Sequence, residues 1–251
     1  MYKFEHISKF YDIFSKGLNQ DVKFYLNEAK KSKGKVLEIA VGTGRISLPL
    51  LEAGVDLYGF DASQNMINVL EDKAKNKKID TKGRIKKADM RNFKYPHKFD
   101  LIIIPYRAFL HNITPDDQVK TLNLCHKHLK EGGKLIINFF FPNPYAMVNR
   151  KEGKETDITV KRKDFSVRLQ GYSRHDYTKQ LIHIKHVYRV KNKGKKIKEF
   201  IEEFTLAWIG VNEFRHLAAR TNFKVKHLYG DFKKRKELKI KRGELIWVLE
   251  K

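Results

Sequence analysis

Hydrophobic side chains between residues 20 and 140 follow two alternating spacings. Residues 101–104 form a continuous apolar run, which is typical of a strand buried on both faces. Over 20–31 the apolar positions instead have the spacing of one helix face, at Val22, Tyr25, Leu26 and Ala29. The chain therefore begins with helices and buried strands in alternation.

The same patterns divide the first 140 residues into elements. Helices are predicted over 20–31, 46–53, 65–75 and 115–129. Strands are predicted over 35–40, 57–60, 84–87, 101–105 and 134–141, and again over 225–229 and 244–249. This order indicates an α/β fold with a seven-stranded, mostly parallel sheet and helices on both faces.

The pattern changes near FPNP at 141–144. From 157 to 209 strands follow one another without helices, and QLIHIKHVYRV (180–190) alternates with period two. KNKGKK at 191–196 has the composition of a hairpin turn, and a helix is predicted over 212–221. We expect a single domain, 1–251, with an antiparallel β insertion over 150–210 after the fifth strand.

The segment VLEIAVGTGR (36–45) joins a buried strand to a helix through Gly42 and Gly44. Glycines permit a sharp turn, and the following helix start offers free N–H groups to a ligand. A dinucleotide fingerprint has a third glycine where this chain has Ser47. The acid Glu38 precedes the turn. A carboxylate at this place would repel a pyrophosphate and attract a cationic ligand. S-adenosylmethionine is such a cationic ligand.

Two further acids follow the next two strands. Asp61 ends LYGFD, 17 residues after Gly44, near the spacing at which an acid reaches ribose hydroxyls. Asp89 in KADMRNF can accept a hydrogen bond from an adenine amino group, with Met90 covering the ring. Ligands of open α/β sheets bind at the carboxyl ends of strands. We expect these acids to share one site.

Taken together, VLEIAVGTGR, GFDAS, ADMRNF, FDLIIIPYRAFLHN and LKEGGKLII resemble the class I S-adenosylmethionine-dependent methyltransferases over about residues 1–140. The resemblance implies a Rossmann-like fold, S-adenosylmethionine as cofactor and S-adenosylhomocysteine as product. Ala40 departs from the family, which often has glycine there. The implied cofactor-binding residues are Tyr11, Glu38, Ala40, Gly42, Gly44, Asp61, Ala62, Met66, Asp89, Met90, Arg91 and Pro105.

A narrower resemblance links YDIFSKG (11–17), ADMRNF and the insertion to small-molecule N-methyltransferases, including amino-sugar N,N-dimethyltransferases and glycine N-methyltransferase-like enzymes. It implies that Tyr11 lies over the cofactor and lines the acceptor pocket. It also implies that 150–210 forms a wall or lid over the acceptor.

Methyl transfer from a sulfonium is an in-line displacement, so the enzyme mainly aligns the nucleophile and excludes water. PYRAFLHN (105–112) follows the fourth strand, where the methyl group is expected. His111 is the candidate proton acceptor because its unperturbed pKa is near neutral. Arg107 could bind an acceptor carboxylate or phosphate, and Tyr106 could line the acceptor site. The alternatives are a packing histidine, a surface arginine and, for Tyr11, core filling.

The net charge of +24 adds a second candidate function. It fits an RNA methyltransferase acting on rRNA or tRNA, an anionic membrane surface, or an acidic substrate, as well as an ordinary solvated surface. The charge is spread along the chain, and is densest at 233–242. Base-directed amino-methyltransferases carry Asn/Asp-Pro-Pro-Tyr after strand four, whereas NPY here is at 143–145, after strand five. A small-molecule acceptor is therefore favoured.

Other composition features exclude classes of protein. The single cysteine, Cys125, excludes an internal disulfide and a cysteine-based zinc site, and favours a reducing cytoplasm. No run reaches the roughly 18 apolar residues of a membrane span, and MYKFEHISKFYD does not have the pattern of a secretion signal. SRHDY (173–177) and HIKH (183–186) contain metal-ligand residue types. His183 and His186 face opposite sides of a strand, so we predict no metal site. No oligomeric state is predicted.

Overall fold

The computed structural model describes residues 8–140, 153–192, 197–234 and 243–251. These residues form a seven-stranded sheet with helices on both faces and a separate four-stranded antiparallel sheet. The motifs at 141–144 and 143–145, the hairpin turn at 193–196, most of the basic run at 233–242 and the first seven residues lie outside the described residues.

The seven-stranded sheet has the order β10-β11-β5-β4-β1-β2-β3. In this sheet β11 runs in the direction opposite to the other strands, and it pairs antiparallel with β5 and β10. This confirms the predicted mostly parallel sheet. Its strands are β1 (Val36–Ile39), β2 (Leu57–Asp61), β3 (Ile85–Lys87), β4 (Phe99–Ile104), β5 (Leu129–Phe140), β10 (Lys224–Tyr229) and β11 (Glu244–Glu250).

Helices cover both faces of this sheet because its strands are apolar on both faces. In β4, Ile102 and Ile104 join the core beneath α5 and α7, whereas Leu101 and Ile103 join the core beneath α2 and α3. The helices are α1 (Ser8–Phe14), α2 (Asp21–Ser32), α3 (Ser47–Glu52), α4 (Gln64–Asn76), α5 (Pro115–His128), α7 (Val211–Arg220) and the 3₁₀ turn η1 (Ala108–His111). None of these described helices is long and apolar enough to cross a membrane.

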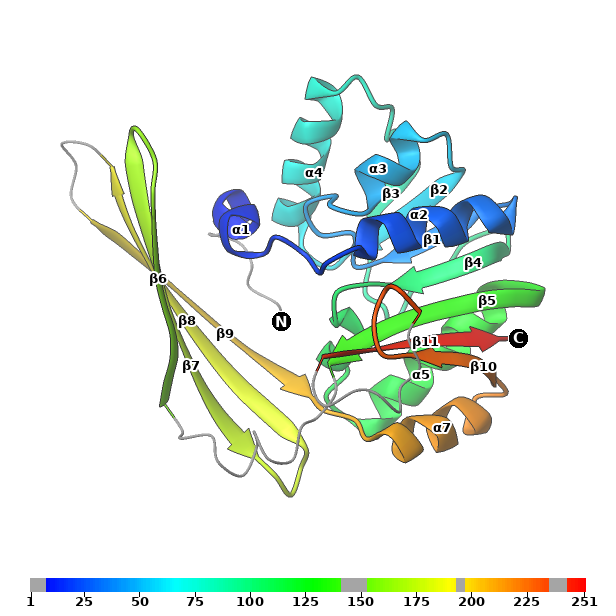
Figure 1. Ribbon diagram of the computed structural model, residues 1–251. Coiled ribbons are helices and arrows are strands. Elements are labelled where there is room, and N and C mark those ends of the chain that lie inside the picture. The colour runs from blue at the N-terminus through cyan, green and yellow to red at the C-terminus, as the bar shows by residue number, and fades with distance from the viewer. Residues whose placement is uncertain (1–7, 141–152, 193–196, 235–242) are drawn as a thin grey trace.

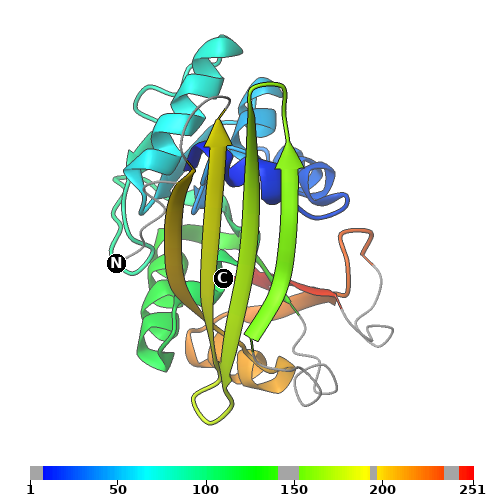
Figure 2. The ribbon, with the colours of Figure 1, turned by 90° about the vertical axis from the view of Figure 1, so that its left-hand side faces the viewer.

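The insertion folds as a four-stranded meander, which confirms its predicted antiparallel character. Its strands are β6 (Gly153–Lys161), β7 (Phe165–Asp176), β8 (Leu181–Asn192) and β9 (Lys198–Ala207). Figure 2 shows these strands side by side as a layer in front of the α/β core. The carboxyl ends of the parallel strands point toward this layer, and α1 lies between the two (Figure 1). The space between the sheets is where the site lies.

Candidate active site

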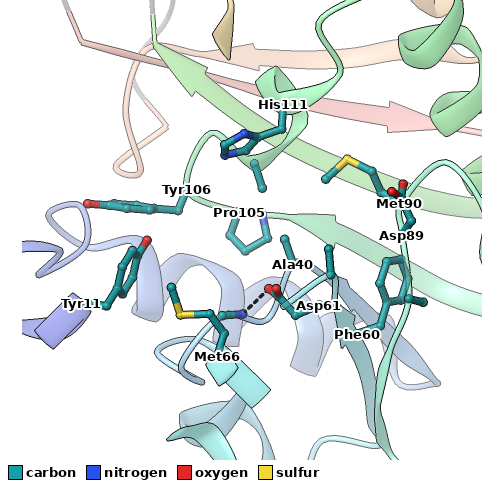
Figure 3. Close-up of a pocket in the computed structure, with 14 residues that line it drawn as sticks. Tyr11, Ala40, Phe60, Asp61, Met66, Asp89, Met90, Pro105, Tyr106 and His111 are labelled. Carbon is teal, nitrogen blue, oxygen red and sulfur yellow. Dashed lines mark hydrogen bonds between the residues drawn. The ribbon is translucent and has the colours of Figure 1, made fainter. Parts of the chain in front are cut away.

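A pocket opens at the carboxyl ends of β1, β2 and β4, where their loops diverge. In Figure 3, Tyr11 and Tyr106 lie on one side of it and Phe60, Asp89 and Met90 on the other. The residues that line it are Tyr11, Ala40, Gly42, Phe60, Asp61, Ala62, Met66, Ala88, Asp89, Met90, Pro105, Tyr106, Ala108 and His111. Most of the predicted site residues are therefore brought together.

The turn after β1 has the left-handed backbone that its glycines permit. Gly42 and Gly44 have φ of 55° and 85°, and Ala40 has φ of 63°. A Cβ at Gly44 would lie 2.8 Å from Cγ of Leu70, whereas one at Gly42 would meet nothing within 4 Å. Gly44 therefore allows close packing below the turn. Gly42 and Ala40 leave the backbone open to the pocket, which Gly44 does not line.

Asp61 connects the turn to the end of β2. Its Oδ2 accepts a hydrogen bond from the Gly42 N–H at 2.8 Å, drawn in Figure 3, and its Oδ1 accepts one from the Ser63 N–H at 2.9 Å. Burial raises the pKa of the Asp61 carboxyl, an effect that these backbone donors oppose. Each carboxylate oxygen can still accept another hydrogen bond. Asp61 is thus fixed in place and still able to bind ligand hydroxyls.

Asp89 is held by Arg91 through two guanidinium contacts, Nε to Oδ1 at 2.9 Å and Nη2 to Oδ2 at 2.6 Å. The Arg91 guanidinium keeps the pKa of Asp89 below its usual value. Arg91 also pairs with Asp117 at 3.2 Å and does not line the pocket. Arg91 therefore fixes the position of Asp89 and does not reach into the pocket. Met90 lines the pocket beside Asp89, with its sulfur 3.2 Å from Nδ2 of Asn112.

Glu38 lies beneath the turn rather than in the pocket. It is 1% exposed, and its Oε2 accepts a hydrogen bond from the Ser47 hydroxyl at 2.6 Å. Burial raises the pKa of Glu38 to about 8. Among the described residues, Glu38 therefore supports the turn from below. Ser47, which occupies the place of the third fingerprint glycine, is its partner.

Helix α1 is fastened to the glycine turn by Asp12, Thr43 and Lys73, which we call the α1 latch. The Thr43 hydroxyl donates to Asp12 at 2.6 Å, and Lys73 pairs with Asp12 and donates to the Thr43 carbonyl at 3.0 Å. The latch places Tyr11 over the pocket (Figure 3). Burial and the neighbouring Tyr106 raise the pKa of Tyr11 to about 12. The latch was not predicted, because no local sequence pattern pairs residues this far apart.

The chain leaves β4 through two residues in the left-handed region, Tyr106 with φ of 54° and Arg107 with φ of 67°. Oδ1 of Asn138 fixes this turn by accepting hydrogen bonds from the Tyr106 N–H at 2.7 Å and the Tyr25 hydroxyl at 3.0 Å. Nδ2 of Asn138 donates to Glu244 at 2.9 Å. Tyr106 is thereby directed into the pocket.

Arg107 differs from its predicted role. Its Nε donates to Glu244 at 2.9 Å, and its Nη2 makes a second contact with the same carboxylate. Its side chain does not line the pocket. The guanidinium predicted to meet an acceptor anion is therefore already paired with a carboxylate of β11. A separate arginine, Arg45, lies over the Tyr106 ring at 4.9 Å and pairs with Asp21.

His111 reaches the pocket from η1, as predicted (Figure 3). Its interpretation as a proton acceptor depended on a pKa near neutrality. Burial instead lowers the pKa of His111 to about 4, because the charged ring is poorly solvated there. The ring is neutral at neutral pH and lies 5.9 Å from the Phe204 ring of β9.

The two histidines of HIKH (183–186) contact hydroxyl groups of neighbouring side chains. No group of three or more metal-ligating side chains occurs in the part of the chain that the structure describes. His183 contacts the Thr205 hydroxyl at 3.1 Å, whereas His186 contacts the Tyr188 hydroxyl at 3.3 Å.

The charge of the pocket is opposite to that of the chain. Its described lining contains two carboxylates, Asp61 and Asp89, and no lysine or arginine, although the chain has a net charge of +24. Such a lining favours a cationic ligand with hydroxyl and amino groups over a pyrophosphate. The carboxylates, the open glycine turn and the apolar side chains of Phe60, Met66 and Met90 fit S-adenosylmethionine.

Comparison with known proteins agrees with this geometry. Residues 36–133 match the family described as the methyltransferase domain. The matched segment contains the glycine turn, Asp61 and Asp89. An uncharacterized methyltransferase of Bacillus mycoides (strain KBAB4) is 34% identical over 107 residues, which cover 43% of this chain and 47% of that protein. The chain thus spans about half the length of the curated relatives it matches.

Solved structures share the fold of nearly the whole chain. An S-adenosylmethionine-dependent methyltransferase from Clostridium acetobutylicum ATCC 824 has a TM-score of 0.78 at 21% identity, covering 96% of this chain and 97% of that one. The sugar N-methyltransferase KedS8 from Streptoalloteichus sp. ATCC 53650 has a TM-score of 0.76 at 18% identity, with 97% and 92% covered. These likenesses establish the fold.

Proposed function

We propose that this chain binds S-adenosylmethionine and transfers its methyl group to a small-molecule acceptor, at nitrogen. The observation that carries the proposal is the acid-lined pocket at the strand ends, which has no lysine or arginine in its described lining. The methyltransferase domain match and the S-adenosylmethionine-dependent and sugar N-methyltransferase neighbours support it.

In this proposal the pocket residues divide by what they contact. Asp61 accepts hydrogen bonds from the ribose hydroxyls, while Asp89 and Met90 meet the adenine. Gly42 and Ala40 admit the amino-acid part of the cofactor. The bound cofactor supplies a methyl group on a positively charged sulfur, which is a good leaving group.

The acceptor side is formed by Tyr11, Tyr106 and His111. Tyr11 and Tyr106 exclude water and orient the acceptor, which is the main demand of an in-line displacement. His111, neutral at neutral pH, accepts a hydrogen bond from the acceptor through its unprotonated nitrogen. The four-stranded sheet, residues 150–210 in the predicted boundaries, forms the wall over this side.

Calorimetric titration with S-adenosylmethionine and S-adenosylhomocysteine tests the cofactor. We expect micromolar binding to the wild type and a loss of about a hundredfold in Asp61→Ala, because two hydrogen bonds to a charged acceptor are removed. Asp72→Ala, an exposed acid on α4, is the matched control and should bind like the wild type. No binding of either ligand to the wild type would reject the proposal.

RNA methylation is the second candidate, supported by the net charge of +24. Release of S-adenosylhomocysteine would be compared for small amines, the corresponding alcohols, and purified tRNA and rRNA. Turnover of RNA alone, weakening steeply with salt, would favour the second candidate. Turnover of an amine supports the first.

A further inference from the structure

Glu202 is a buried carboxylic acid on the inner face of the four-stranded sheet. Its neighbours in β9 alternate outward, with Ile201 51% exposed and Glu203 also exposed, whereas Glu202 is 4% exposed. Both of its carboxylate oxygens are buried, and neither has a hydrogen-bond partner among the described residues. Asp61 and Asp89, the acids of the cofactor pocket, both have hydrogen-bond partners, and Glu202 differs from them in this respect.

Aromatic and imidazole side chains surround Glu202 on this face. We call the set His186, Tyr188, Glu202 and Phe204 the inner wall. Glu202 is directly opposite His186 in the pairing of β8 with β9. The Phe204 ring lies 5.3 Å from the His186 ring, and the Tyr188 hydroxyl contacts Nδ1 of His186 at 3.3 Å.

The inner wall borders the acceptor side of the pocket at two points. Phe204 reaches the ring of His111, and η1 packs against β9. At the other point α1 packs on Tyr188, whose ring lies 5.9 Å from that of Phe14. Burial and the nearby charges of Glu202 and Tyr11 raise the pKa of Tyr188. The inner wall therefore contacts His111 directly and the helix that carries Tyr11, and both of these residues line the pocket (Figure 3).

An unpartnered carboxyl is costly in this position. Burying a charge without a partner is strongly unfavourable, and burial accordingly raises the pKa of Glu202 to about 8. An apolar residue beside Phe200 and Phe204 would stabilise the sheet more. A cation placed next to Glu202 would restore its ionised form and relieve the cost.

We propose that Glu202 binds the cationic amine of the acceptor, which makes the acceptor a small compound with a basic primary or secondary amine. This inference rests on the proposed function, since that amine is the nitrogen to be methylated. The Glu202 carboxylate takes one proton from the bound ammonium, and the nitrogen lone pair so freed forms a bond to the methyl carbon as the bond from that carbon to the cofactor sulfur breaks. An ionised carboxylate only accepts hydrogen bonds, and an ammonium group only donates them. The ring faces of Phe204 and Tyr188 also attract cations. Since the described residues offer no group of three metal ligands, an organic cation is the fitting occupant.

Two probes of equal shape, cyclohexylamine and cyclohexanol, test the inference. Each is titrated calorimetrically into protein saturated with S-adenosylhomocysteine. We expect Glu202→Gln to bind cyclohexylamine about thirtyfold more weakly than the wild type, because one member of a buried charge pair is removed. Cyclohexanol should not distinguish the two proteins. Glu203→Gln is the matched control, since Glu203 is exposed and pairs with Lys185, and it should behave as the wild type.

Equal responses of the wild type and Glu202→Gln to cyclohexylamine, including none in both, would overturn the inference. Unchanged affinity for S-adenosylhomocysteine confirms that the variant is folded. If Glu202→Gln does not fold, Glu202→Asp replaces it. Wild-type protein that binds cyclohexylamine no more tightly than cyclohexanol would also overturn the inference. If cyclohexylamine binding requires Glu202 but no amine is methylated, Glu202 still binds an amine. In that case nitrogen is not the atom that accepts the methyl group.

Discussion

Acids of the two sheets that meet at the pocket differ in whether they have hydrogen-bond partners. Glu38, Asp61 and Asp89 belong to the seven-stranded sheet and its loops, and each has a partner: the Ser47 hydroxyl, backbone N–H groups, or a guanidinium. Glu202 in the four-stranded sheet has none among the described residues. The difference teaches that these acids of the first sheet are paired within the protein. The second sheet leaves one buried acid for a ligand to pair with.

The sheets differ in packing as well. The central strands of the seven-stranded sheet are buried on both faces, as β4 and β11 show. The four-stranded sheet buries one face against α1 and exposes Ile201 on the other, and Ile158 of its edge strand β6 is also exposed. Most of the apolar burial that stabilises the protein therefore lies in the first sheet, which leaves the second free to shape an acceptor site.

Removing the centre of the internal network should have the largest effect. Asn138→Ala leaves the Tyr25 hydroxyl, the Tyr106 N–H and Glu244 without their partner, in a fully buried site. We expect the free energy of unfolding to fall by about 4 kcal/mol, measured by urea denaturation. Asn123→Ala, on the exposed side of α5, should change it by less than about 0.5 kcal/mol. Similar losses in both variants would contradict the network.

The isolated acid of the second sheet should give a pH-dependent effect in the opposite direction. The pKa of Glu202 is about 8 in the folded protein against an ordinary 4.5, so the fold favours its protonated form. Its contribution to stability is lost as pH rises from 4.5 to 8. Glu202→Gln should become more stable relative to the wild type over this range, by about 4 kcal/mol at pH 8.

Thermal and urea unfolding of both proteins at pH 5 and pH 8 would measure this difference. Glu38, with a similarly raised pKa, is present in both proteins and cancels in the comparison. The other titratable groups around Glu202 are also shared: Tyr11, His111, His186 and Tyr188. A difference in stability that does not change with pH would show that Glu202 ionises as readily in the folded protein as in the unfolded chain, and therefore has a partner there.

The α1 latch joins the two regions, and its loss should have a smaller effect. Asp12→Ala removes the hydrogen bond from Thr43 and the ion pair with Lys73, which is partly exposed. We expect S-adenosylmethionine to bind about fivefold more weakly, since such pairs contribute about 1 kcal/mol. Calorimetry measures the change, with Asp72→Ala as control. An unchanged affinity would mean that α1 stays docked through its apolar contacts with the four-stranded sheet.

The smallest effect is expected from salt. The pocket lining has no lysine or arginine among the described residues. Cofactor affinity should therefore change less than about twofold between low and high salt, because few counterions are released. A steep decrease in cofactor affinity with salt would mean that basic groups lie near the bound cofactor. The pocket would then not differ in charge from the basic surface.

The cofactor half could be predicted from the sequence in considerable detail. The apolar runs at 101–104 and 135–137 can be satisfied only by strands buried on both faces. Asp61 directly follows the predicted strand 57–60, and Asp89 closely follows the predicted strand 84–87. Because carboxyl ends of parallel strands meet at one edge, Asp61 and Asp89 were expected together, and both line the pocket. These features are local in sequence, so periodicity and spacing were sufficient.

Other features depended on contacts between distant residues. The pairing of Arg107 with Glu244, the latch between Asp12 and Lys73, and the burial that lowers the pKa of His111 each join segments with no common sequence pattern. Glu202 occupies a strand position that alternation alone would not distinguish as chemically important. The sequence by itself determined the sheet and its cofactor edge. Only the tertiary structure decided which polar groups already have partners, because desolvation and pairing depend on the surroundings of a side chain.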